Sequence, residues 1–185
     1  MKKVILAVLF CVTFSGAFAQ NQAPSSGMAI SFAFTRQGGT STDTFAIWVE
    51  DSHGNFVRTL YATRFIASGA WKTRPQGIPL WVERSGISKL SKSEVDAFTG
   101  ATPRTSQLNY RWNGLDKNGK PSPAGEYKVF LEGTLRGDNR VVYSAPFTLG
   151  TAAAAASKEA VLNAQYFGTS TTARGMITDV KVVYW

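Results

Sequence analysis

The sequence predicts an all-β protein, an antiparallel β-sandwich interrupted by a partly helical insertion. About seven short segments alternate bulky side chains with small or polar ones, the pattern of strands that bury one face. Between them lie clusters of Gly, Asn, Asp and Pro, which mark turns. No glycine-rich phosphate loop follows a strand and opens a helix, and this argues against a nucleotide-binding α/β fold.

The first 19 residues are expected to be a secretory signal peptide that is removed on export. Lys2 and Lys3 precede an apolar run over residues 4–14, and residues 17–19 are Ala-Phe-Ala, a typical cleavage site. The alternative, an uncleaved anchor helix, is disfavoured because the apolar run is shorter than the roughly 20 residues that span a bilayer. The mature protein is therefore expected in the periplasm.

Removal of residues 1–19 leaves few reactive side chains. This segment holds Cys11, the only cysteine, and two of the 20 basic residues but none of the 12 acidic ones, so the net charge falls from +8 to +6. His53 is the only histidine, so the mature chain lacks the ligands for the usual Cys/His zinc site. No second apolar run approaches spanning length, and we expect no transmembrane segment in the mature chain.

Residues 20–27 are expected to form a flexible leader and residues 28–185 a single domain. The first strands are expected at residues 28–35, 44–50 and 56–61. In the second of them, the apolar residues on one face are Phe45, Ile47 and Val49, with Trp48 on the other face.

The polar run over residues 51–55 predicts a hairpin turn that contains His53. A histidine in such a turn is more typical of a solvated residue than of a catalytic one. A hydrolase with a Ser-His-Asp triad would depend on this one residue, and no nucleophile elbow accompanies it.

The strand pattern breaks over residues 62–105, where we expect an insertion. Short helices are expected at residues 79–85, with a proline in the first turn, and at residues 91–98, where Ser91 and Glu94 make a capping box. The region from residue 58 to residue 104 holds eight basic and three acidic residues, so +5 of the charge lies here. Such a surface suits an anionic ligand or partner, or is simply solvated. Nucleic acid is not expected as a partner of an exported chain without a binding motif.

The second half of the domain predicts four more strands. They are expected at residues 107–112, 126–132, 140–149 and 177–185, with a loop over residues 133–139. In the last strand the odd-numbered and even-numbered residues are expected on opposite faces. Residues 151–157 are rich in alanine and predict a linker or the start of a helix, and the pattern of residues 157–167 is ambiguous.

The segment from Trp112 to Tyr127 fits the pattern W-[DN]-G-x-D-x-x-G-x-x-x-P-A-G-x-Y without a gap. It predicts two strands joined by a turn-rich loop, in which the two aromatic rings cover the end of the core. Asp116 is expected to accept backbone N–H groups, and the glycines to supply positive φ angles. The pattern resembles bacterial immunoglobulin-like modules, so the resemblance implies an immunoglobulin-like sandwich. It implies little about function.

A second motif lies in the insertion, where residues 96–102 fit D-x-x-[ST]-G-A-T. The motif resembles the target at which ApbE-type flavin transferases attach FMN through its phosphate to the last threonine. The resemblance implies that Thr102 is the acceptor and that the recognised segment includes the motif residues Asp96, Thr99, Gly100 and Ala101. Arg104 is expected to pair with the FMN phosphate. The alternative is a glycine-containing turn that matches the motif by chance.

The aromatic residues of the insertion offer partners for the flavin ring. Trp71, Trp81 and Phe98 are the candidates to stack on the isoalloxazine.

The order of several segments resembles the periplasmic family called domain of unknown function 2271. The segments are residues 46–51, residues 54–60, the helix with Trp81, residues 95–104 and the loop after Trp112. The resemblance covers about residues 28–149 and implies association with membrane redox proteins of the PepSY type and with flavin transferases, in extracytoplasmic electron transfer or iron uptake.

Two functions are therefore expected as alternatives. The first is an exported redox-accessory protein that carries covalent FMN on Thr102, in which the flavin supplies the chemistry and the protein supplies placement and electrostatics. The second is a non-catalytic binding or scaffold module that docks a membrane partner through its basic insertion. In neither case is the chain expected to be an enzyme by itself.

Overall fold

The computed structural model describes residues 26–38, 42–150 and 156–185, without the side chains of residues 171–173. The expected signal peptide, most of the leader and the alanine tract lie outside the described residues. Ser26 and Gly27 do not belong to a free leader. The backbones of Gly27 and Trp185 exchange two hydrogen bonds of 3.0 Å, and the Ser26 hydroxyl donates to the Trp185 carbonyl oxygen over 2.8 Å.

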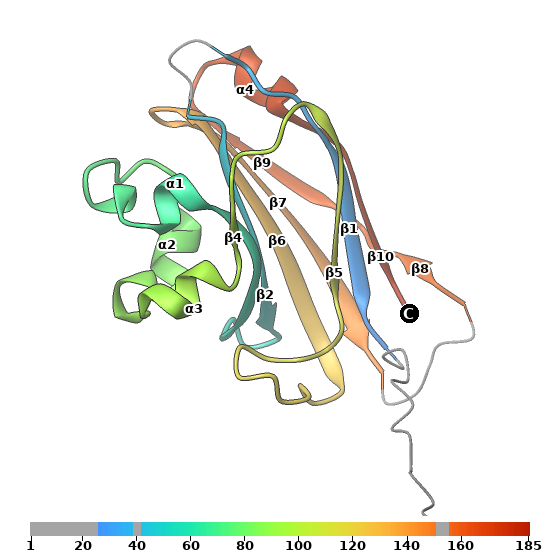
Figure 1. Cartoon of the computed structure of the whole chain (residues 1–185). Helices are drawn as coiled ribbons and strands as arrows, with labels where there is room; N and C mark the ends of the chain where they lie inside the picture. Colours follow the sequence, from blue (N-terminus) through green and yellow to red (C-terminus); the bar gives the residue numbers. More distant parts are fainter. Residues whose placement is uncertain (1–25, 39–41, 151–155) are drawn as a thin grey trace, which may run out of the picture.

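The described residues form two sheets that pack face to face, which confirms the predicted sandwich (Figure 1). The first sheet has the order β5-β1-β10-β8, and the second has the order β4-β3-β2-β6-β7-β9. The strands are β1 (Met28–Phe34), β2 (Thr44–Asp51), β3 (Phe56–Thr63), β4 (Thr99–Gly100), β5 (Ser106–Trp112), β6 (Gly125–Arg136), β7 (Asn139–Leu149), β8 (Lys158–Glu159), β9 (Asn163–Phe167) and β10 (Ile177–Tyr184). All pairs are antiparallel except β3 with β4, which is parallel.

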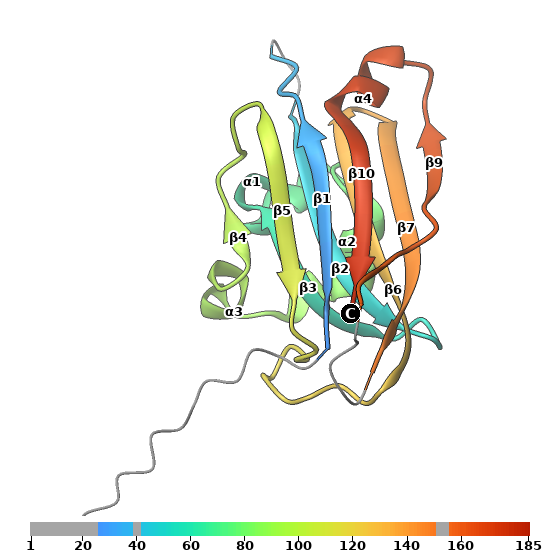
Figure 2. The ribbon, with the colours of Figure 1, turned by 90° about the vertical axis from the view of Figure 1, so that its right-hand side faces the viewer.

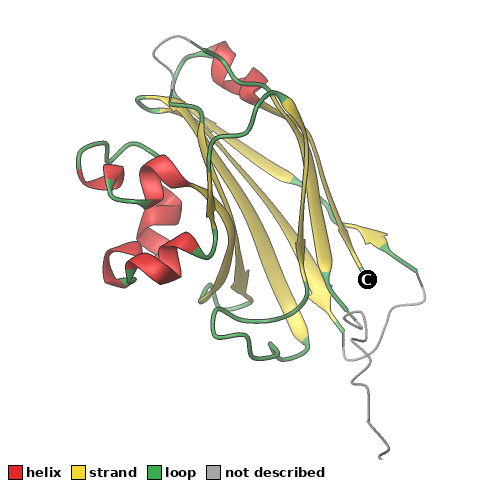
Figure 3. Ribbon diagram, viewed as in Figure 1, coloured by secondary structure: helices red, strands yellow, loops and turns green. Residues whose placement is uncertain are grey.

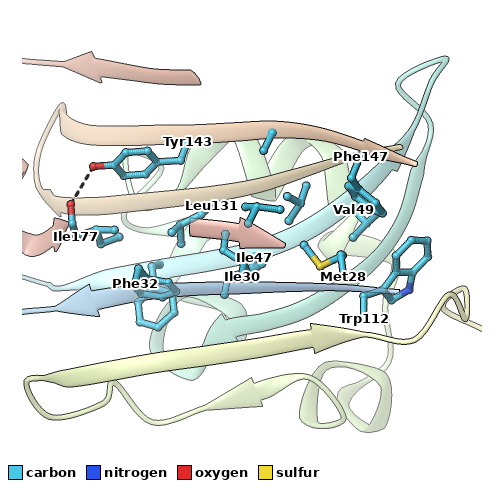
Figure 4. Close-up of a cluster of buried hydrophobic side chains, with 14 of the residues drawn as sticks. Met28, Ile30, Phe32, Ile47, Val49, Trp112, Leu131, Tyr143, Phe147 and Ile177 are labelled. Atoms are coloured by element: carbon cyan, nitrogen blue, oxygen red, sulfur yellow. Dashed lines mark hydrogen bonds between the residues drawn. The ribbon is translucent and has the colours of Figure 1, made fainter. Parts of the chain in front are cut away.

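The main core lies between the two sheets and is built from the apolar faces that alternation predicts (Figure 4). Phe45, Ile47 and Val49 of β2 all point into it, as expected, and each is fully buried. The Tyr143 hydroxyl, which enters this core, donates to the Ile177 carbonyl oxygen over 2.9 Å, so a buried polar group is satisfied.

The insertion forms a second core on the outer face of the six-stranded sheet (Figure 3). Its helical turns are α1 (Arg64–Ala67), η1 (Ala70–Lys72), α2 (Pro79–Ser85), η2 (Ile87–Lys89) and α3 (Lys92–Asp96). Trp48 of β2 points away from the main core and stacks on Phe130 of β6, with ring centroids 5.0 Å apart. Because both faces of β2 are covered, the strand is buried from Thr44 to Glu50.

Both expected helices of the insertion are confirmed. The first has the predicted bounds, with Pro79 in its first turn. The second is shorter than expected and begins with the predicted capping box, in which the Glu94 N–H donates to the Ser91 hydroxyl and the Ser91 N–H donates to the Glu94 carboxylate. Two satisfied backbone donors stabilise a helix of only five residues.

Two details of the C-terminal half differ from the sequence expectation. The expected loop over residues 133–139 is wrong, because β6 and β7 continue to a tight turn at Gly137 and Asp138. Strict alternation in β10 also fails. Asp179 has a φ of 53°, and the pairing with β1 shifts beside it, so Ile177 and the even-numbered Val182 both face the core.

The ambiguous stretch after the alanine tract contains two strands. β8 lies at the edge of the first sheet, and β9 lies at the edge of the second. A short helix that the sequence did not predict, α4 (Thr171–Met176), leads into β10 (Figure 2).

The turn-rich loop after β5 has the expected construction. The Trp112 and Tyr127 rings lie 5.2 Å apart at the end of the core. Oδ1 of Asp116 accepts the backbone N–H groups of Asn118 (2.8 Å) and Lys120 (2.9 Å), and Gly114 and Gly119 both have a φ of 76°. The loop thus closes one end of the sandwich.

Candidate functional site

The predicted flavin-attachment motif lies on the segment that crosses from one sheet to the other. Asp96 is the last residue of α3, and Thr99 and Gly100 then form β4 at the edge of the second sheet. Beyond β4 the chain passes to β5 at the edge of the first sheet (Figures 1 and 2). Thr102 therefore lies in a linking segment at the side of the sandwich, outside any helix or strand.

The start of this linking segment is fixed by backbone pairing. Thr99 and Gly100 pair with Ala62 and Thr63 of β3, and the Ala62 N–H donates to the Phe98 carbonyl oxygen over 3.1 Å. Two residues would make a weak strand alone, but here they add to a strand already held by β2. The backbone leading to Thr102 therefore has a defined position.

Tyr61 contacts the linking segment at Gly100 and Ala101, and its ring leaves no room for a side chain at position 100. Its hydroxyl donates to the Ala101 carbonyl oxygen over 2.8 Å. A Cβ atom on Gly100 would lie 2.7 Å from Cε2 of the Tyr61 ring, closer than real side chains approach. The motif therefore needs a glycine here to allow this close packing. A left-handed backbone is not the reason, since the φ angle of Gly100 is not positive.

Three polar groups of the motif region lack a partner among the described residues. The Thr99 hydroxyl oxygen is buried and accepts no hydrogen bond there. The Thr102 side chain is half-buried, and the Arg104 side chain is exposed. Neither makes a side-chain hydrogen bond or an ion pair within the described ranges; Arg104 only accepts the Ser106 hydroxyl at its carbonyl oxygen over 3.1 Å.

The structure does not join Asp96 to the rest of the motif. Its carboxylate is exposed at the end of α3. In the part of the chain that the structure describes, no hydrogen bond or ion pair connects it with Thr102 or Arg104. The structure therefore leaves the Asp96 side chain exposed at the end of α3, apart from Thr102 and Arg104.

An aromatic group lies beneath the segment, and the sequence reasoning missed it. The centroid of the Tyr61 ring lies 4.9 Å from that of Phe45 and 5.0 Å from that of Tyr110. Tyr61 therefore connects the linking segment to the main core. Burial raises the pKa of Tyr61 to about 12, so its hydroxyl stays protonated and available as a donor at neutral pH. The available signal was a tyrosine at the end of a strand, immediately before the pattern breaks.

One of the three candidates for stacking on a flavin is excluded. Trp81 is fully buried in the second core, and its indole N–H donates to the Thr59 hydroxyl over 3.0 Å. Phe98 is half-buried and meets Trp81 edge-on, with centroids 6.0 Å apart. Trp71 is also half-buried, and the Lys72 ammonium lies 5.4 Å from its ring centroid.

Most of the basic side chains of the insertion are exposed. The exposed side chains are those of Arg64, Lys72, Arg74, Arg84, Lys89, Lys92 and Arg104. Of these, Arg84 is engaged, since its guanidinium lies 3.6 Å from the Glu50 carboxylate. Exposed cations of this kind suit an anionic surface, although charge by itself does not identify one.

His53 lies in the predicted turn and is exposed. Asp51 Oδ1 accepts the backbone N–H groups of His53 and Asn55, each over 2.9 Å. The Asn55 side-chain amide, which donates to Asp51 Oδ2 over 2.9 Å, and these backbone N–H groups hold the pKa of the Asp51 carboxyl below its usual value. Among the described residues, no group of three His, Cys, Asp or Glu side chains is placed to hold a metal ion.

Comparison with known proteins gives one match. The family model described as "Predicted periplasmic protein (DUF2271)" matches residues 28–166. No curated protein and no solved structure matches significantly. Within the described residues, no helix has the length and apolar character to cross a membrane.

Proposed function

The chain belongs to the DUF2271 family of predicted periplasmic proteins, and we propose that it is a redox-accessory protein of that compartment, with FMN attached covalently to Thr102. The observation that carries this proposal is the position of Thr102. Its hydroxyl belongs to a D-x-x-T-G-A-T motif on a fixed crossing segment and has no hydrogen-bond partner among the described residues.

The construction of the segment supports the proposal. Gly100 and Ala101 carry little or no side chain, so the approach to Thr102 is not crowded by its neighbours. Tyr61 and β3 fix the backbone below. A transferase would thus meet a segment whose backbone is already fixed as far as Ala101, which lowers the ordering cost of binding it.

The charges nearby also fit a phosphoester. Arg104 is exposed two residues beyond Thr102, and its guanidinium is able to pair with a phosphate in a bidentate manner. The bound flavin would supply one-electron and two-electron transfer, and the chain would supply its position and electrostatic surroundings.

Attachment requires an external flavin transferase and its flavin-nucleotide donor. The Thr102 oxygen forms a new bond to the FMN phosphorus, the phosphorus–oxygen bond to the donor's leaving group breaks, and the hydroxyl proton passes to the transferase. The exposed Asp96 and the motif residues from Thr99 to Ala101 are the segment that we expect the transferase to recognise.

Co-expression with an ApbE-type flavin transferase tests the proposal. We expect a yellow protein whose intact mass exceeds that of the mature chain by one FMN less one water, and a fluorescent band on a denaturing gel. Thr102→Ala removes the acceptor oxygen and is expected to abolish the label.

Thr105→Ala is the matched control, because Thr105 is an exposed threonine on the same segment, and it should be labelled like wild type. Equal labelling of Thr102→Ala and wild type would refute attachment at Thr102. A colourless wild type beside a transferase that labels a known target would refute flavinylation.

The second candidate function is a binding module without a flavin. The observation that favours it is the set of exposed basic side chains in the insertion, of which, within the described residues, only Arg84 forms an ion pair. Such a module would dock an acidic surface of a membrane redox protein of the PepSY type. An intact mass equal to that of the unmodified mature chain, measured on protein from the native host, would favour this function.

A further inference from the structure

A groove beside the turn-rich loop after β5, whose lining includes none of the flavin-motif residues, brings together residues from both sheets. We call it the edge groove. Its volume is about 650 Å³, and it is lined by Arg58 and Leu60 of β3, Arg111 of β5, Asn113 and Leu115 of the following turn, and Trp185. Figure 2 shows that the end of β5 and the C-terminal residue lie at the same end of the molecule.

The edge groove is cationic. Neither the Arg58 nor the Arg111 guanidinium forms an ion pair in the part of the chain that the structure describes, whereas other arginines do. Arg58 Nη1 donates only to the Asp116 carbonyl oxygen, over 3.2 Å. A guanidinium has five N–H donors, so most of the donors of this pair are unused.

The donors are held in place by the surrounding structure. The Arg111 guanidinium lies 4.9 Å from the Trp185 ring centroid, and such stacking leaves the N–H edge of the guanidinium exposed. Trp185 is fixed in turn by its backbone bonds to Gly27. The Asn113 side-chain oxygen accepts the Leu115 N–H over 3.3 Å, so its amide group points its two N–H donors elsewhere.

None of the described side chains that line the groove is acidic. Asp116 is the acidic residue that follows the groove in sequence, but its Oδ1 is occupied by two backbone N–H groups of its own turn. These bonds hold the pKa of Asp116 below its usual value, the contact with the Lys120 N–H being the largest cause. The remaining walls are apolar: Leu60, Leu115 and the Trp185 ring.

We propose that the edge groove is a binding site for a small organic anion that carries a carboxylate or a phosphate on an apolar or aromatic body. The charged group lies between Arg58 and Arg111, where charge-assisted hydrogen bonds replace its water. The body lies against the leucines and the indole. The site is separate from Thr102 and does not depend on flavin attachment.

Calorimetric titration of the purified mature protein with three related probes tests this proposal. The probes are 1-naphthoate, 1-naphthyl phosphate and the neutral 1-naphthol. We expect at least one of the anions to bind about tenfold or more tightly than the neutral probe, because hydrogen bonds from a guanidinium to an anion are stronger than those to a neutral hydroxyl. The ratio between the two anions shows whether a carboxylate or a phosphate is preferred.

Substitutions locate the binding. Arg111→Gln and Arg58→Gln should each weaken the preferred anion about tenfold and leave 1-naphthol unchanged. Lys89→Gln, which removes an exposed cation outside the groove, should have no effect. Arg111 is exposed, so Arg111→Gln alone decides the matter if Arg58→Gln disturbs the turn. The proposal is overturned if 1-naphthol binds as tightly as both anions, or if a folded Arg111→Gln protein binds them like wild type.

Discussion

Gly100 and Tyr61 show how a single contact determines the position of the proposed acceptor. The ring of Tyr61 is fixed by Phe45 and Tyr110, and the backbone of Gly100 lies directly against it. The carbonyl oxygen of the next residue, Ala101, accepts a hydrogen bond from the Tyr61 hydroxyl. This contact therefore fixes the backbone immediately before Thr102. A side chain added at Gly100 would have to displace either the Tyr61 ring or the Gly100 backbone.

Gly100→Ala is expected to destabilise the protein by about 1–3 kcal/mol, the usual cost of overpacking. The added Cβ would lie 2.7 Å from Cε2 of Tyr61, whose ring packs against Phe45 and Tyr110. Urea denaturation measures the loss. In a Tyr61→Ala background the same substitution should cost much less, because the obstructing ring is absent. Equal costs in both backgrounds would show that Tyr61 is not the obstacle.

At the residue scale, sequence reasoning succeeded where a local pattern determines the structure. The Asp116 turn and the Ser91 capping box involve residues within four positions of each other, so the sequence displays the whole interaction. Tyr61 was missed as a site residue because its partner, Ala101, is 40 residues away. Its role depends on β4 pairing with β3, which no local pattern indicates.

The position of α2 on the sheet depends on a buried carboxylate. Glu132 of β6 is fully buried, and its two oxygens accept the N–H groups of Leu80 (3.2 Å) and Trp81 (2.8 Å) at the start of the helix. The Arg140 guanidinium lies 3.6 Å away. Glu132 thus satisfies N-terminal donors that α2 cannot satisfy itself, since Ile78 provides no side-chain cap.

This carboxylate should make stability depend on pH. Burial raises the pKa of Glu132 from 4.5 to about 7, partly offset by the N–H groups and Arg140. Between these values the unfolded chain has released the proton while the folded chain retains it. The free energy of unfolding should therefore fall as pH rises from about 4.5 to about 7, by up to roughly 3 kcal/mol for this group.

Urea denaturation across that pH range, compared between wild type and Glu132→Gln, isolates the effect. The variant carries no titrating group at this position, so its stability should change less with pH than that of wild type. Glu126→Gln, which removes an exposed glutamate from the same strand, is the control and should follow wild type. Parallel curves for wild type and Glu132→Gln would contradict the buried titration.

At the element scale, the strands were predictable because alternation of apolar residues records which face is buried. The exceptions have physical causes. Glu132 looks solvent-facing in its strand, yet the insertion covers it. In β10 the positive φ of Asp179 moves the core face from odd-numbered to even-numbered residues. An aspartate within a strand pattern does not by itself predict such a bulge. Both exceptions depend on contacts between distant segments.

The whole molecule consists of two cores that share one sheet. Phe45, Ile47 and Val49 of β2 belong to the core between the sheets, while Trp48 belongs to the core under the insertion. The Trp48 indole N–H donates to Glu50 over 2.9 Å, and Glu50 in turn meets Arg84 of the insertion. Loss of the second core would therefore uncover a face of β2, so the insertion and the sandwich should unfold together.

Trp81→Ala tests this coupling. Removing a fully buried indole should lower the free energy of unfolding by about 3–5 kcal/mol. Because the cores share β2, far-UV circular dichroism, which follows the strands, and tryptophan fluorescence should both report a single transition, shifted equally to lower urea concentration. Trp71→Ala, at a half-buried position of the same insertion, should shift it less. If the Trp81→Ala fluorescence changed well before the strand signal, the insertion would be an independent unit. The fixed approach to Thr102 would then depend on β3 and Tyr61 alone.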